Sequence, residues 1–330
     1  MSDRRPSPSR SGRFILAAAY TAGGAALFIY VVRRAGVAEI VDGIQRVGWG
    51  LAAILAVAGL RFVLRAQCWR LCMPAGSQVT FLRAWTTFLA GDAIGGVTPL
   101  GLLASEPTKV FLTRHHLATR DSVASLAVEN LIYGASVVAM IAVGIIVALA
   151  TAAMSPIWWW GIAAALAAAC VATAVVIRLL QGTWDDARGA RPRWRATLAD
   201  LRQTVIGFSA QHPERLWQAF GLDAGFHLLG VVEVYLTLLW LLGNRAPTLA
   251  QAVAFEALNR AVTIAFKFVP FRIGVDEALT GVVAPALALN PAAGVSLAVV
   301  RKARNLFWTG VGLAIIGAHP ARTERGPAPL

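Results

Sequence analysis

Charged residues are scarce in this sequence, since only 14% of its 330 residues are Asp, Glu, Lys or Arg. Ordinary soluble domains contain about 25% charged residues, and disordered chains combine low hydrophobicity with high net charge. The apolar set makes up 57% of the chain, and the mean hydropathy is +0.63. Several apolar runs exceed the roughly 18 residues that are typical of a membrane-spanning helix. The composition excludes the soluble and disordered classes and predicts an all-α polytopic membrane protein.

Cysteine and histidine are also rare. The three cysteines, Cys68, Cys72 and Cys170, are too few for a disulfide framework, and no second ligand pair near Cys68 and Cys72 suggests zinc. The sequence has no GxxxxGK[ST] loop, no HExxH motif and no Ser-His-Asp context. We therefore expect no cofactor, and neither ATP-driven transport by this chain alone nor membrane proteolysis is indicated.

The apolar runs predict six full spans and two interrupted stretches. The expected spans are 14–32, 48–64, 123–150, 157–177, 216–243 and 293–317. The stretches 84–113 and 249–289 are broken by the polar strings GDAIGGVTPLGLLASEP and FKFVPFRIGVDE. Proline ends a helix, and broken backbone at membrane depth must be buried in protein or line a wet cavity. We expect both stretches to form re-entrant helical hairpins, although 249–269 is long enough to span.

The basic residues give the orientation. With a net charge of +13, most Lys and Arg residues gather in the tail 1–13, at 61–83 and 109–120, in the loop 178–214 and in the tail 318–330. Cytoplasmic loops carry an excess of such residues, and they attract anionic lipid headgroups. We therefore expect both termini on the cytoplasmic side of a bacterial inner membrane and no nucleic-acid partner. The Trp158–Trp160 run fits an aromatic belt, and 36–47 a short interfacial helix.

A weak internal repeat relates the two interrupted stretches. A shift of 171 residues places Pro99 on Pro270, Glu106 on Glu277 and the first SLAV tetrapeptide on the second. Chance similarity in a biased composition is the alternative. The predicted topology makes the units 48–150 and 216–317 run in opposite directions. Inverted repeats with broken helices that meet near the midplane are typical of secondary transporters.

Eight acidic residues lie in or beside apolar segments. They are Asp92, Glu106, Glu129, Asp223, Glu233, Glu256, Asp276 and Glu277. A charge at the bilayer centre costs about 2.5–3.5 kcal/mol, so these acids must be paired or hydrated. We expect Glu129 to contact Arg301 or Arg304. One interpretation is that the charges only join the two halves of the protein.

The other interpretation is a hydrated cavity that binds an anionic headgroup. Its expected lining residues are Glu106, Lys109, Arg272, Asp276, Glu277, Arg301 and Arg304. Guanidinium groups bind phosphate through charge-assisted hydrogen bonds, so this interpretation assigns the cations to the headgroup.

The strings VTPLGLLASEPTKVFLTRH, DSVASLAVEN, VPFRIGVDEALTG and SLAVVRKARN resemble the flippase-like transmembrane region of lysylphosphatidylglycerol synthases. The resemblance covers about 14–317 and implies lipid translocation. It assigns roles to Thr98, Pro99, Glu106 and Pro107, and to Pro270, Gly274, Glu277 and Arg301. The chain departs from the family pattern at LLAS and at Asn130, where an arginine is usual. We expect no lysyl transfer.

The charges and the resemblance together define the candidate lipid-binding residues. They are Thr98, Pro99, Glu106, Lys109, Glu129, Asn130, Pro270, Arg272, Asp276, Glu277, Arg301 and Arg304. The leading hypothesis is a lipid translocase within one domain, 14–317, whose partners are membrane lipids and possible lipid-biosynthesis proteins. The alternatives are an integral membrane enzyme that transfers a group to a lipid headgroup and a non-catalytic partner of a lipid-synthesis complex.

Overall fold

The computed structural model describes residues 37–98, 101–151, 203, 206–208, 210–243, 245–266, 270–272 and 274–318. Every regular element in these ranges is a helix. The predicted spans 14–32 and 157–177 and the Trp158–Trp160 run lie outside the described residues, as do Pro99 and most of the predicted loop and tails.

The described helices form two runs. The first contains α2 (Val37–Val47), α3 (Gly50–Cys72), α4 (Phe81–Val97), α5 (Gly101–Thr113) and α6 (Thr119–Thr151). The second contains α9 (Pro213–Leu242), α10 (Leu249–Ala265), the 3-10 turn η1 (Pro270–Arg272), α11 (Val275–Val283), η2 (Ala284–Leu287) and α12 (Pro291–Ala318).

Helix length separates two kinds of element. Of the described helices, α3, α6 and α9 are long and apolar enough to cross a membrane. Helix α12 has 28 residues but carries Arg301, Lys302 and Arg304 near its centre. Both interrupted stretches are divided in two: α4 and α10 have 17 residues each, whereas α5 has 13 and α11 has nine. At 1.5 Å per residue, 17 residues reach only about 25 Å.

The order of elements repeats with the shift seen in the sequence. A displacement of 171 residues carries α3 onto the C-terminal part of α9, α4 onto α10, α5 onto α11 and α6 onto α12. Each unit is therefore a long helix, two short helices and a second long helix. The short helices α4 and α10 both begin at a threonine N-cap, Thr80 and Thr248, whose hydroxyl accepts a backbone hydrogen bond.

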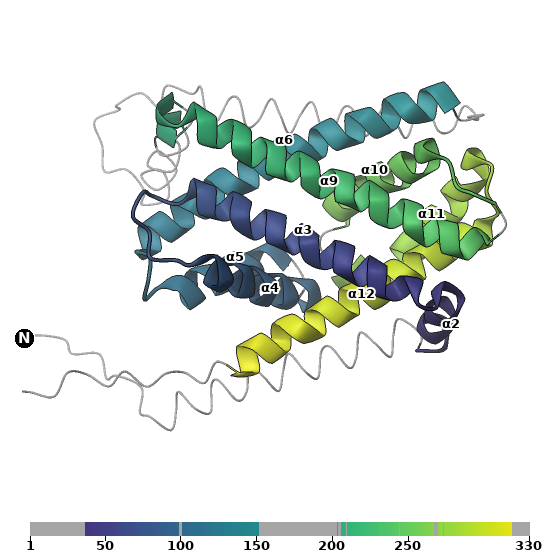
Figure 1. The fold of residues 1–330 in the computed structure, drawn as a ribbon, viewed down its shortest axis with the longest axis horizontal. Coiled ribbons are helices and arrows are strands. Elements are labelled where there is room, and N and C mark those ends of the chain that lie inside the picture. The colour runs from purple at the N-terminus through teal and green to yellow at the C-terminus, as the bar shows by residue number, and fades with distance from the viewer. Residues whose placement is uncertain are drawn as a thin grey trace, which may run out of the picture.

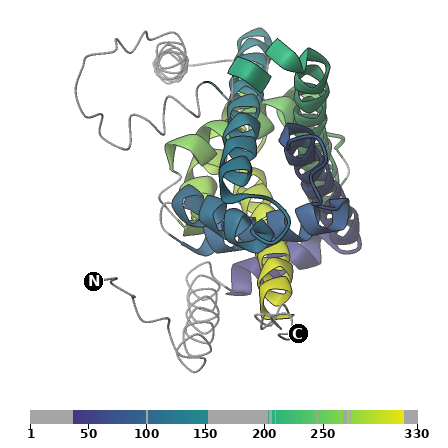
Figure 2. The same ribbon diagram turned by 90° about the vertical axis from the view of Figure 1, so that its left-hand side faces the viewer.

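The two units exchange helices across their interface. Helices α3 and α9 lie side by side in both views and run antiparallel, because Gly50 meets Trp240 whereas Cys68 meets Ala219 (Figure 1 and Figure 2). Helix α4 packs on α12 of the other unit, and α6 packs on α10 in the same antiparallel sense. This reciprocal pairing is what an approximate twofold axis perpendicular to α3 and α9 produces.

The contact between α4 and α12 depends on a glycine. A Cβ atom at Gly312 would lie 2.5 Å from the carbonyl oxygen of Leu89 and 2.6 Å from the Cβ atom of Ala93. We expect Gly312→Ala to destabilise the protein by about 1–3 kcal/mol, because the helices must separate. Thermal unfolding of the purified protein in detergent measures the change.

Gly310, two residues earlier on the same helix, is the matched control. A Cβ atom there meets nothing within 4 Å. Since alanine favours a helix over glycine by about 1 kcal/mol, Gly310→Ala should be neutral or stabilising. Equal unfolding temperatures for the two variants would contradict the packing of α4 on α12.

Candidate functional site

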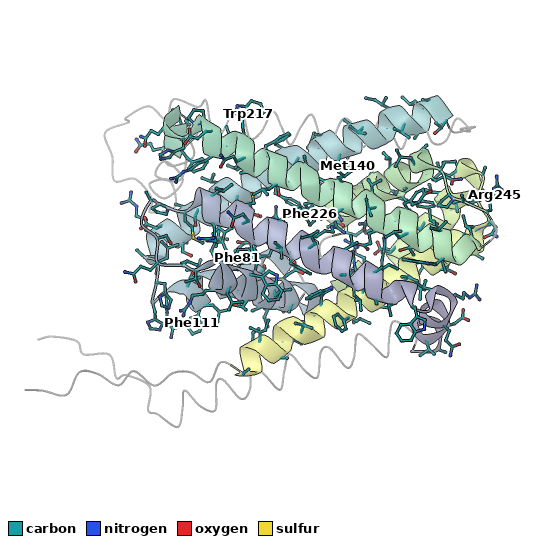
Figure 3. All side chains as sticks on the ribbon, viewed as in Figure 1. Phe81, Phe111, Met140, Trp217, Phe226 and Arg245 are labelled. Atoms are coloured by element: carbon teal, nitrogen blue, oxygen red, sulfur yellow. The ribbon has the colours of Figure 1, made fainter. Side chains whose placement is uncertain are left out.

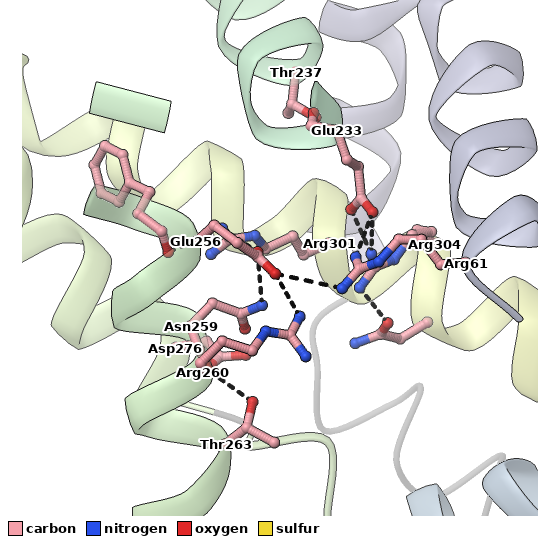
Figure 4. Close-up of polar contacts among 12 residues, drawn as sticks. Arg61, Glu233, Thr237, Glu256, Asn259, Arg260, Thr263, Asp276, Arg301 and Arg304 are labelled. Atoms are coloured by element: carbon pink, nitrogen blue, oxygen red, sulfur yellow. Dashed lines mark hydrogen bonds and ion pairs between the residues drawn. The ribbon is translucent and has the colours of Figure 1, made fainter. Parts of the chain in front are cut away.

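Charged side chains are buried where the two units meet. Four arginines from three helices surround two glutamates, and we call this set the arginine cluster. Its members are Arg61 on α3, Arg260 on α10, Arg301 and Arg304 on α12, Glu233 on α9 and Glu256 on α10 (Figure 4). Each of the six residues is at most 8% exposed.

Glu256 contacts three of the four arginines. The shortest distances from its carboxylate oxygens are 2.8 Å to Arg260, 3.3 Å to Arg61 and 3.8 Å to Arg301. Arg301 is the least engaged of these, and its Nη2 also donates to the carbonyl oxygen of Phe255 at 3.2 Å. Glu256 therefore holds together α3, α10 and α12.

Glu233 contacts the remaining arginine. Its carboxylate pairs with Arg304 and lies 2.8 Å from Nη1 of Arg61. Arginine stays protonated in proteins. Four guanidinium groups against two carboxylates therefore leave the cluster with an excess of two positive charges, even when both glutamates are ionised.

An aromatic ring supports the cluster. Phe226 of α9 faces α3, and the guanidinium carbon of Arg61 lies 4.3 Å from the centre of its ring (Figure 3). The guanidinium of Arg260 lies 5.3 Å from the same ring. Such cation–π contacts are worth about 2 kcal/mol when they are desolvated, so the ring keeps the arginines in place without neutralising them.

A second buried group, which we call the Arg65 triad, adjoins the cluster. Arg65 lies one turn after Arg61 on α3, with Nη2 2.6 Å from Oε1 of Glu129 on α6 and Nη1 3.2 Å from Oδ1 of Asp223 on α9. Its guanidinium carbon lies 3.7 Å from the centre of the Tyr133 ring. The hydroxyl of Tyr133 accepts a hydrogen bond from Arg260 at 3.2 Å. Tyr133 thus connects the triad to the arginine cluster.

Two buried lysines are each neutralised by a glutamate beside a helix break. Lys109 pairs with Glu106 at 2.9 Å on α5, and Lys302 of α12 pairs with Glu277 of α11. Oε2 of Glu277 also accepts from the backbone nitrogen of Gly274 at 3.0 Å. The side chains of Glu106 and Glu277 are both 21% exposed, whereas those of the lysines are at most 4% exposed. The glutamates are therefore the accessible partners.

The break before α11 is held in an unusual backbone conformation. Phe271 and Arg272 have φ angles of 51° and 49°, values that are rare for residues other than glycine. The side chain of Arg272 lies 3.0 Å from Asp276 and donates to Asn259 and Thr263. The ring of Phe271 packs against Gly96, near the end of α4. The two breaks therefore lie close together in the fold.

The candidate residues do not all converge. Arg301 and Arg304 belong to the arginine cluster and Glu129 to the triad, whereas Thr98 and Asn130 bond to carbonyl oxygens of their own helices, those of Ile94 and Leu126. Pro270 begins η1. The predicted contact of Glu129 with Arg301 or Arg304 is wrong, because Arg65 occupies its carboxylate.

The most central cations were assigned to the wrong place. The sequence puts Arg61 and Arg65 in a polar segment after a span that ends at 64, but α3 continues to Cys72 and buries both side chains. The missed signal is their spacing of four residues, which places them on one helix face. Arg260, Glu233 and Glu256 stood out as charges in apolar segments, but no sequence pattern identified their partners.

A serine and a histidine also meet in the interior, with a structural arrangement. The hydroxyl of Ser136 donates to the carbonyl oxygen of Tyr133 at 2.8 Å, so it accepts from Nε2 of His227, 3.1 Å away. A serine whose proton points to a backbone carbonyl is not activated by the histidine, since activation requires the proton to point to the imidazole. The pair joins α6 to α9.

Long apolar helices around a buried, charged interior define an all-helical membrane protein. Within that class, the chain belongs to the family of the lysylphosphatidylglycerol synthase TM region, whose profile matches residues 14–312. The predicted resemblance is thus confirmed, and membership indicates a membrane protein involved in lipid modification or transport. No curated protein and no solved structure matches the chain.

Proposed function

We propose that this protein is a flippase-like lipid translocase of the bacterial cytoplasmic membrane. It would bind an anionic or glycosylated lipid headgroup inside the bundle while the acyl chains stay in the bilayer. The observation that carries the proposal is the arginine cluster, in which two positive charges of four lack a carboxylate partner within the cluster. A buried excess of cations is costly unless an anion can approach it, and phosphate is the anion that guanidinium groups bind best.

The exchange of helices between the units supports transport. Translocation requires two conformations that expose one site to either side of the membrane. The antiparallel pairing of α3 with α9 makes the units inverted relative to each other when these helices span the bilayer. The short pairs α4–α5 and α10–α11 would then be re-entrant hairpins, and six full spans would complete the bundle. This is the architecture of many secondary transporters.

A groove between α5 and α6 gives the acyl chains a place. It has a volume of about 590 Å³ and a mainly apolar lining that includes Pro107, Phe111 and Val123. Glu106 and Asn130, two of the candidate residues, also line it. A lipid could therefore keep its chains in this groove while its headgroup reaches the Lys109–Glu106 pair.

The competing function is transfer of a group to a lipid headgroup, and we propose that the protein does not catalyse it. Mass spectrometry of lipids recovered from liposomes separates the two functions, because an enzyme produces a new lipid species whereas a translocase does not. The proposal also places both termini in the cytoplasm. A reporter fused after Ala318 should therefore be active on the cytoplasmic side.

Arg301 provides the direct test. Because its guanidinium lies 3.8 Å from Glu256, it is the cluster arginine most available to a ligand. We expect Arg301→Gln to slow translocation of fluorescent phosphatidylglycerol about 10–100-fold, since a hydrogen bond to a charged group is worth about 1.5–3 kcal/mol. Liposomes and a membrane-impermeant quencher measure the rate.

Arg245, an exposed residue after α9, is the matched control. Arg245→Gln removes the same charge from the surface and should leave the rate unchanged. Equal rates for Arg301→Gln and the unsubstituted protein would refute a role of the cluster in headgroup binding. No movement of lipid by the unsubstituted protein would refute the translocase itself.

A further inference from the structure

We infer that the Arg65 triad is a proton-binding site and that its proton couples to the anion bound by the arginine cluster. The site consists of the carboxyl groups of Glu129 and Asp223, which face one guanidinium from two sides. The coupling rests on the proposed function, whereas the proton site itself does not.

The triad has one positive charge for two carboxylates. Glu129 and Asp223 are both 0% exposed. Oε2 of Glu129 and Oδ2 of Asp223 are buried and have no hydrogen-bond partner among the described residues. An ionised carboxylate without a partner is very unfavourable in an apolar interior. The two free oxygens are therefore acceptor positions that a proton would satisfy.

The neighbouring groups do not supply a second counter-charge. The titratable and charged groups that face the triad are Cys68 on α3, Glu106 and Lys109 on α5, Tyr133 on α6 and His227 on α9. Lys109 is already paired with Glu106 at 2.9 Å. The thiol of Cys68 points to the carbonyl oxygen of Ala219, 3.7 Å away. Arg61, one turn from Arg65, is held by Glu233 and Glu256.

The protonation step is simple to balance. A proton from water binds a carboxylate oxygen of Glu129 or Asp223 and converts that group to a neutral carboxylic acid. The other carboxylate stays ionised and keeps its ion pair with Arg65, so the charge of the triad rises from minus one to zero. Two carboxylates that share a site titrate as a pair, and one of them holds its proton strongly.

The link to anion binding runs through Tyr133. Its ring stacks on Arg65, and its hydroxyl accepts from Arg260 of the arginine cluster. Protonation of the triad adds one positive charge beside a cluster that already carries an excess, and this favours an anion there. By linkage, a bound anion must favour the proton equally. A proton and an anionic headgroup would therefore move together.

Infrared spectroscopy of the protein in liposomes tests the proton site directly. We expect a C=O stretching band of a protonated carboxyl group at neutral pH that shifts in heavy water and disappears reversibly at high pH. The band should be lost in Glu129→Gln and in Asp223→Asn, because each variant leaves one carboxylate for one guanidinium. Asp42→Asn, which changes an exposed carboxylate on α2, should keep the band.

Two results would overturn the proton site. One is absence of the band from the unsubstituted protein, and this measurement requires no variant to fold. The other is persistence of the band in both triad variants.

Translocation of fluorescent phosphatidylglycerol under a pH gradient tests the coupling. We expect a higher rate when the gradient runs in the direction of lipid movement, and a rate independent of the gradient would overturn the coupling. If the band is present but no lipid moves, the proposed function fails and the proton site stands. If lipid moves without the band, the proton site fails and the translocase stands.

Discussion

Replacing Glu256 with glutamine should destabilise the protein by about 3–5 kcal/mol, the usual cost of leaving buried charges without their partner. Glu256 is the shared carboxylate of Arg61, Arg260 and Arg301. Glutamine keeps the shape of the side chain but removes the negative charge, so three guanidinium groups from three helices repel one another. Thermal unfolding of the purified protein in detergent should show the loss.

Asp42→Asn is the appropriate comparison, because it also removes one carboxylate from an ion pair. Asp42 lies 2.9 Å from Arg46 on α2, but both side chains are more than half exposed. Exposed pairs contribute about 0–1 kcal/mol, so this variant should unfold close to the unsubstituted protein. If Glu256→Gln unfolds at the same temperature as Asp42→Asn, Glu256 does not organise the cluster.

The architecture could be predicted from the sequence because apolar runs and proline breaks are local signals. The runs at 123–150 and 216–243 correspond to α6 and α9, and the strings around Thr98 and Gly274 correspond to the breaks after α4 and α10. The repeat was visible because proline and glutamate are scarce in apolar segments. Their recurrence at one spacing reflects two units that share the same sequence of elements.

The partners of the charges could not be predicted, because they depend on how the helices are placed against one another. Glu129 was expected to cross to the other unit, yet its partner Arg65 lies on α3 of the same unit. The charges do not follow the repeat: a shift of 171 residues carries Arg65 onto Leu236 and Glu129 onto Val300. Two units can therefore share a fold while the ionic network between them is asymmetric.

The last prediction concerns Glu106 and Glu277, the repeated glutamates. Each neutralises a buried lysine and is the more exposed member of its pair. We expect Glu106→Gln and Glu277→Gln to reduce translocation of fluorescent phosphatidylglycerol to the rate of protein-free liposomes, although both variants should still insert and fold. The quencher assay in liposomes measures the rate, and circular dichroism in detergent checks the fold.

The physical reason is release rather than binding. An anionic headgroup that reaches Lys109 or Lys302 must displace the glutamate, and the glutamate must displace the headgroup again on the other side. Without the competing carboxylate, the lysine keeps the anion, and a ligand that cannot leave stops the cycle. The variants should therefore retain bound fluorescent phosphatidylglycerol after washing. Transport by both variants at the rate of the unsubstituted protein would show that the two pairs only fasten α5 and α11 within the bundle.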